Sequence, residues 1–246
     1  MPQTIHYGRI LIKRFRALLW LVRPALAPRG LENVKTRLRR ASRILAGQRD
    51  HAVMQLTLKK LEKKGVSARD RKALTRVSQA VCWNTSTGPE SDKAGRDSLQ
   101  KAMMLFLASV AETEKSVSGD EAWPFSSGRV PRAFRAAHHA AKKALKSGEA
   151  VRFHEWRKKA KRLLYQLELT RLKPDQYTTR LIKKVDRLQA KLGAYHDCVV
   201  AEDTLRYKAP SRADAKRIST LLKKREGRLR KKAQKIARSI PKQPRS

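Results

Sequence analysis

The spacing of apolar residues is the feature that most restricts the fold of this chain. Between clusters of proline and glycine, apolar side chains recur every three or four positions, and no segment sustains the alternation of a half-buried strand. The pattern predicts an all-α protein. We expect loops at 85–92 and 116–128, and helices over residues 4–23, 31–46, 49–63, 68–84, 94–115, 130–147, 150–172, 175–193, 195–208 and 212–239.

The charge of the chain predicts its kind of partner. Lysine and arginine number 59 against 21 acidic residues, which gives a formal net charge of +38. Like charges at this density repel one another and weaken the compact state. Because 40% of the residues are hydrophobic, a core can still form. The balance therefore predicts a folded protein that binds a polyanion.

The composition also argues against several classes of protein. Cys82 and Cys198 are too few for a disulfide framework or a four-thiolate metal site, so we expect a reducing compartment, the cytoplasm. The apolar run at 17–22 ends at Arg23 and is too short for the core of a signal peptide. No stretch approaches the length of a membrane span.

An internal repeat is the most informative pattern in the chain. Histidine, arginine, lysine and arginine recur in register 148 positions apart, from His6 to Arg14 and from His154 to Arg162. Residues 49–58 then match 196–205 at an offset of 147. The agreement predicts one duplicated domain over residues 1–240, with halves of about 1–118 and 129–240, followed by a disordered tail at 241–246.

Helical geometry gives the repeat a chemical meaning. Positions 0, +3 and +7 of a helix fall within about 60° of one another, so the repeated histidine, arginine and lysine share a face. The predicted cationic stripes are His6, Arg9 and Lys13, extended by Arg16, and His154, Arg157 and Lys161. Leu11, Phe15, Leu18, Val22, Leu163 and Leu167 project roughly opposite and are predicted to be core.

The stripes are suited to binding rather than to catalysis. Arginine offers a fork of donors and lysine a point charge, which together fit phosphate oxygens presented in series. Histidine close to phosphate becomes cationic. The matched residues include no carboxylate, cysteine or serine that could act as a nucleophile or hold a metal. We therefore expect no catalytic residue, no metal and no cofactor.

Two segments resemble a known family. The first runs from His154 to Glu168 and the second from Leu188 to Val199; both are similar to the CHAD domain, the conserved histidine α-helical domain. The first copy, from His6 to Leu58, is similar but has Gly8 where the family has a larger residue. The resemblance implies two helical bundles related by a pseudo-twofold axis around a basic central pore or cavity, polyphosphate binding, and association with polyphosphate granules.

The resemblance and the repeat together predict a binding set. The family motif carries over to His6, Arg9, Lys13, Arg16, His154, Arg157, Lys161 and Arg162. The chain's own repeat aligns Arg37 with Lys184 and Arg40 with Arg187, which adds these four residues. The helix before His154 adds Arg132, Arg135 and Lys142.

Three alternatives remain at this point. A nucleic-acid-binding protein would use the same charge, and weaker nucleic-acid binding is expected at low salt. Aromatic residues are only 6% of the chain, however, and no nucleic-acid recognition motif is visible. An enzyme acting on polyphosphate would need a carboxylate cluster for a divalent metal.

The last helix, 212–239, packs through an apolar stripe or is a basic tail that folds on binding.

Overall fold

The computed structural model describes residues 2–46, 50–62, 66–82, 89–116, 128–170 and 175–242. Within these ranges it contains nine α-helices, a 3-10 helix at Arg23–Ala25 and no strand, which confirms the all-α prediction. The helices are α1 (Pro2–Val22), α2 (Pro28–Ile44), α3 (Asp50–Glu62), α4 (Ala68–Cys82), α5 (Pro89–Ser116), α6 (Arg129–Ser147), α7 (Ala150–Leu169), α8 (Gln176–Lys208) and α9 (Arg212–Arg238).

Two predicted helices, 175–193 and 195–208, are one. The break expected after Gly193 is wrong, because α8 continues through this residue. A glycine inside a helix costs about 1 kcal/mol relative to alanine, which is too little to end a helix that is packed on both sides. Only Gly148, at the end of α6, has a positive φ (72°) among the described glycines.

Prolines open helices that were predicted to begin later. Helix α2 begins at Pro28 and α5 at Pro89, because the fixed φ of proline suits the first turn of a helix and its missing N–H is not needed there. The predicted loop at 85–92 is therefore helical from residue 89. The remaining residues of that loop, and 117–127 of the other predicted loop, lie outside the described residues.

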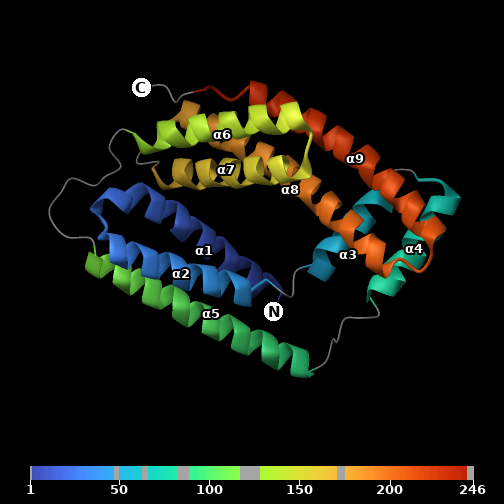
Figure 1. Cartoon of the computed structure of the whole chain (residues 1–246), viewed down its shortest axis with the longest axis horizontal. Coiled ribbons are helices and arrows are strands. Elements are labelled where there is room, and N and C mark those ends of the chain that lie inside the picture. Colours follow the sequence, from blue (N-terminus) through green and yellow to red (C-terminus); the bar gives the residue numbers. More distant parts are fainter. Residues whose placement is uncertain are drawn as a thin grey trace.

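The helices form two packed groups (Figure 1). Helices α1, α2 and α5 lie side by side around one hydrophobic cluster that includes Ile12, Leu38 and Ala102. Helices α6 to α9 share a second, larger cluster with α3 and α4, which includes Trp156, Leu192 and Leu58. The predicted core is confirmed for Val22, Leu163 and Leu167, partly so for Phe15 and Leu18, and wrong for Leu11, which is 44% exposed.

Helices α3 and α4 pack against α8 and α9 rather than against α2 and α5 (Figure 1). The contact includes an ion pair that joins α4 to the first turn of α9: Arg76 Nε and Nη2 donate to the two oxygens of the buried Asp214 at 2.9 and 2.6 Å. Hydrogen bonding from Arg76 is the main reason that the pKa of Asp214 lies below its usual value. The first half of the chain thus supplies part of the core of the second.

Helix α9 is a packing helix, as the first alternative predicted. Its apolar stripe is buried at Ile218, Leu222, Leu229 and Ala233. Beyond its end, Ile240 is buried and the Pro241 carbonyl lies 2.9 Å from Nε2 of His138 on α6. Of the predicted tail, residues 243–246 lie outside the described residues. Among the described helices, none has the length and hydrophobicity needed to cross a bilayer.

Candidate polyanion-binding site

The two helices that carry the predicted stripes, α1 and α7, contact each other through their C-terminal halves. Arg14 Nη2 of α1 lies 3.1 Å from Glu168 Oε2 of α7, and its guanidinium lies 5.9 Å from the ring of Tyr165. In return, Arg162 of α7 lies 5.7 Å from the ring of Trp20 on α1. The fold therefore brings the two stripe helices together.

Helix α8 meets the N-terminal half of the same face of α7. The rings of His154 and His196 are 4.7 Å apart, centroid to centroid. One turn along, Arg157 lies over Gly193, where a Cβ atom would be 3.7 Å from the Arg157 Nε. A larger side chain at residue 193 would occupy the space that Arg157 uses, so Gly193 gives α8 a close approach to the stripe.

The stripe on α7 therefore lies between α1 and α8. His154, Arg157 and Lys161 share one face, and Tyr165 continues it with the Lys161 ammonium 5.7 Å from its ring. Burial raises the pKa of Tyr165. The acidic neighbours Glu168 of α7 and Asp186 of α8 raise it further, whereas Arg14 and Arg157 lower it. We call His154, Arg157, Lys161, Arg162, Arg14 and His196 the basic cluster.

The electrostatics of His154 oppose its protonation. Burial is the first cause that lowers the pKa of this histidine, and the neighbouring cations Lys158 and Arg157 lower it further. Its Nδ1 atom is enclosed and has no hydrogen-bond partner among the described residues. The imidazole is therefore held mainly neutral near pH 7 in the absence of ligand; the cationic ring expected beside a bound phosphate stays a prediction.

Two of the predicted binding arginines are partly desolvated. Desolvation lowers the pKa of Arg162, and desolvation followed by the nearby Arg39 lowers the pKa of Arg16. Arginine nevertheless stays protonated at any physiological pH. A desolvated guanidinium has lost water ligands that a bound anion can replace.

The first predicted stripe is less uniform than the second. His6 and Arg16 are exposed, and Lys13 is half-buried. Arg9 is also half-buried, and its Nη1 donates to the Leu45 carbonyl at 2.7 Å, just beyond the end of α2. Arg9 therefore stabilises the C-terminus of a helix in addition to any role in binding.

Two other predicted binding residues have structural contacts. Arg37 Nη1 forms an ion pair with Glu112 of α5 and donates to the Ala108 carbonyl at 3.3 Å. Lys184 Nζ donates to the Ser239 carbonyl, beyond the end of α9, at 3.1 Å. The structure does not bring these two side chains into the basic cluster.

The remaining predicted residues are solvent-exposed, and their side chains make no hydrogen bond or ion pair with the described residues. They are Arg40, Arg132, Arg135, Lys142 and Arg187. Burial lowers the pKa of Arg129, and the nearby Arg132 lowers it further.

Sequence reasoning missed Arg14, His196 and the aromatic residues Trp20 and Tyr165. The signals for the first two were present, because Arg14 aligns with Arg162 in the repeat and His196 lies in the second family-like segment. Trp20 gave no signal. It is placed by tertiary packing, and Arg129 also lies 5.1 Å from its ring.

The chemistry available to the cluster is anion binding. No group of three or more histidine, cysteine or acidic side chains that could hold a metal occurs in the part of the chain that the structure describes. Cys198 is buried, and burial raises the pKa of its thiol to about 11, which disfavours a nucleophilic thiolate.

Comparison with known proteins gives one result. The family model for the CHAD domain matches residues 1–206, whereas no curated protein and no solved structure gives a significant match. The matched region contains α1 to α7 and almost all of α8, and hence every residue of the basic cluster. The chain belongs to the CHAD family.

Proposed function

We propose that this protein binds inorganic polyphosphate through the basic cluster and performs no chemistry on it. The observation that carries the proposal is the position of His154, Arg157 and Lys161 between α1 and α8, where basic side chains from three helices converge. Arginine forks and lysine ammonium groups along a helix face fit successive phosphates of a linear chain. Membership of the CHAD family supports the same ligand.

The duplication and the pseudo-twofold axis belong to this proposal. Two contacts support them, since α1 pairs with α7 and the hairpin of α3 and α4 pairs with α8 and α9. In the register of the repeat, α2 and α3 correspond to the N- and C-terminal parts of α8. Each contact therefore joins corresponding elements, which is the pattern expected close to a twofold axis.

A polyphosphate chain would follow a basic path between the halves. On this proposal the path runs along α7 and continues toward the stripe of His6, Arg9, Lys13 and Arg16 on α1, in a central pore or cavity. Arg40, Arg132, Arg135, Lys142 and Arg187 would add outer contacts, and Arg37 and Lys184 could contribute only by leaving their present partners. We further propose one domain over residues 1–240 and a cytoplasmic location on polyphosphate granules.

Nucleic acid is the competitor that an experiment must exclude. Polyphosphate and nucleic acid both release counterions on binding to a basic surface, so weak binding of both is expected at low salt. We suggest competing labelled long-chain polyphosphate from the full chain with unlabelled polyphosphate, duplex DNA or single-stranded RNA. The three competitors are compared at equal phosphate concentration and at an ionic strength of about 0.15 M.

The proposal predicts that unlabelled polyphosphate displaces the label at a concentration at least about tenfold lower than either nucleic acid, a difference of about 1.4 kcal/mol. Displacement by DNA or RNA at an equal or lower concentration would show that the physiological ligand is a nucleic acid.

A further inference from the structure

Exposed and half-buried apolar side chains of α1 and α5 lie along one side of this helix pair, and we call this surface the apolar groove. The two helices touch through Phe15 and Phe106, whose rings meet edge to face at 5.4 Å. On α1, Tyr7 is 63% and Leu11 44% exposed, and on α5, Met104 is 65% and Leu107 59% exposed. The half-buried Leu18, Met103 and Val110 complete the groove.

Helix periodicity places these side chains on one side of the α1–α5 pair. Tyr7, Leu11 and Leu18 fall within about 40° of one another on α1, and Met103, Leu107 and Val110 within about 60° on α5, with Met104 at the outer edge about 60° beyond Leu107. Helix α5 has no charged residue from Ala102 to Ala111, although 33% of the chain is charged. A contiguous apolar face of this kind on an exposed helix usually marks a contact site.

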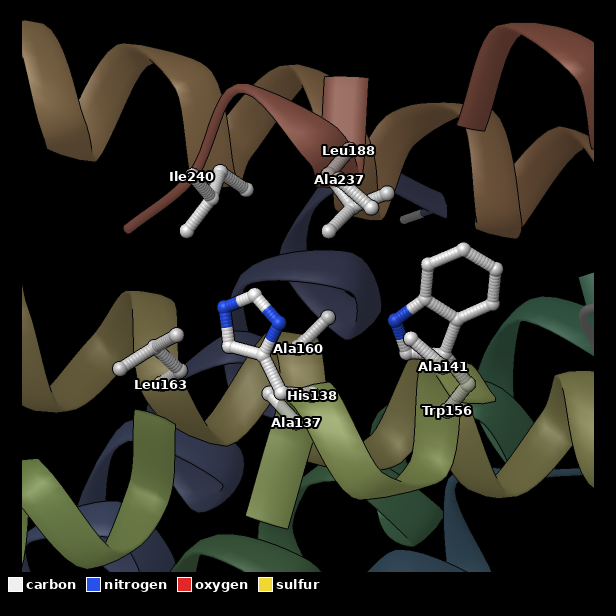
Figure 2. Close-up of a pocket in the computed structure, with 9 residues that line it drawn as sticks. All are labelled: Ala137, His138, Ala141, Trp156, Ala160, Leu163, Leu188, Ala237 and Ile240. Atoms are coloured by element: carbon white, nitrogen blue, oxygen red, sulfur yellow. The ribbon is translucent and has the colours of Figure 1, made fainter. Parts of the chain in front are cut away.

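The other group of helices shows what can cover such a groove. There α6 packs along α7 and touches α9, and its buried face consists of Ala133, Phe134, Ala137, Ala141 and Ala144. Figure 2 shows where these helices meet: Ala137 and Ala141 of α6 lie against Trp156 and Leu163 of α7, with Ile240 beyond the end of α9. Only a small gap of about 10 Å³ remains.

The sequence repeat aligns the groove with the surface under α6. Tyr7 and Leu11 correspond to Glu155 and Lys159, which line the edge of the α6–α7 contact together with His139 and Lys143 of α6. In α1 the two edge positions are apolar. No described helix lies over α1 and α5 as α6 lies over α7 and α9.

We propose that this groove binds an amphipathic helix of another polypeptide, in the place that α6 takes in the other group. The apolar side of that helix would be built from small residues with an occasional aromatic, as in α6, because small side chains allow two helix axes to approach to roughly 8–10 Å. Its outer side would be acidic. A chain of net charge +38 attracts an acidic partner and repels a second copy of itself.

The test uses the full chain and a peptide derived from α6. The peptide has the sequence of Arg129–Ser147, with Arg132, Arg135, Lys142, Lys143 and Lys146 each replaced by glutamate so that the outer side is acidic and the buried side is unchanged. A control peptide has the same composition in an order that disperses the apolar stripe. Binding is measured by fluorescence anisotropy at an ionic strength of about 0.15 M.

Two double variants of the protein separate the groove from charge in general. Leu11→Asp with Leu107→Asp should weaken binding of the stripe peptide at least about tenfold. Leu56→Asp with Tyr207→Asp changes two exposed hydrophobic residues elsewhere, 55% and 87% exposed, and should leave binding unchanged. Because all four side chains are exposed, helical content by circular dichroism should stay the same in both variants.

Equal binding of the two peptides, or equal binding of the stripe peptide to both double variants, would overturn the proposal. So would a dimer of the protein in analytical ultracentrifugation that Leu11→Asp with Leu107→Asp dissociates, because the groove would then bind a second copy. Loss of polyphosphate binding has no bearing on these outcomes, since none of the changed residues belongs to the basic cluster.

Discussion

At His154, burial and neighbouring cations both act against the protonated ring. A histidine whose pKa is lowered on folding stabilises the native state above its unfolded pKa of about 6.5, and that contribution is lost as the pH falls from this value through the lower folded pKa. A bound polyanion acts in the opposite direction, because negative charge beside the ring favours the imidazolium. Binding and proton uptake should therefore be coupled.

This coupling predicts that polyphosphate affinity rises as the pH falls from 8 to 5.5. One proton taken up on binding gives a limiting slope of about tenfold per pH unit. Titration of labelled polyphosphate at several pH values, at constant ionic strength, measures the slope.

His154→Gln should bind polyphosphate with a smaller pH dependence and should unfold with less sensitivity to mild acid. His139→Gln is a suitable control, because His139 is an exposed histidine on α6, outside the basic cluster. An unchanged slope in His154→Gln, or an equal decrease in both variants, would mean that another group takes up the proton.

Among the helices, α8 shows how far the sequence could predict the secondary structure. Periodicity predicted helix over each of the nine described α-helices, although it divided α8 into two. It could not tell that α8 continues through Gly193, because a glycine at a break and a glycine at a close approach look the same in sequence. Only the packing of Arg157 over residue 193 distinguishes them.

Alanine substitutions at Gly193 and Gly148 should have opposite effects on the free energy of unfolding. Gly193→Ala should raise the free energy of unfolding by about 1 kcal/mol, because it removes a flexible residue from a helix interior and its Cβ makes an ordinary contact. Gly148→Ala should lower it by about 1 kcal/mol or more, because φ is 72° and the new Cβ would lie 3.1 Å from Arg230 Nη2. Chemical denaturation measures both.

The larger change Gly193→Leu should displace Arg157 and weaken polyphosphate binding, whereas Gly193→Ala should leave it intact. Equal affinity of the alanine and leucine variants would show that Arg157 does not need the space over residue 193.

For the whole molecule, the larger hydrophobic cluster predicts cooperation between distant parts of the sequence. Leu58 of α3 is 2% exposed and belongs to the cluster of α6 to α9. Leu58→Ala should cost about 2–5 kcal/mol. Hydrogen exchange should then increase in α8 and α9 as well as in α3 and α4.

Leu38→Ala serves as a control, because Leu38 is fully buried in the cluster of α1, α2 and α5. Its exchange should increase mainly in those three helices. If Leu58→Ala affected only α3 and α4, the two parts of the cluster would be unfolding independently.

The site was predictable to the extent that it lies on single helices. The stripe on α7 follows from the spacing of His154, Arg157 and Lys161, and the repeat indicated that α1 carries a related face. The partners of Arg37 and Lys184 depend on which helices are neighbours, and charge alone does not distinguish a cation that faces a ligand from one that bonds Glu112 or the Ser239 carbonyl. The contacts of Trp20 with Arg162 and Arg129 also depend on which helices are neighbours, so the sequence did not indicate them.

The central claim is that organised cations on α7, and not net charge, bind polyphosphate. The most direct test measures the dissociation constant for long-chain polyphosphate at an ionic strength of about 0.15 M. It compares two double variants, Arg157→Glu with Lys161→Glu on α7 and Lys231→Glu with Lys235→Glu on α9. Both variants change the charge equally, and the second pair is exposed on α9. We predict a loss of at least about 100-fold for the α7 pair and under about fivefold for the α9 pair, with helical content unchanged. Equal losses would contradict the account and would assign binding to diffuse charge.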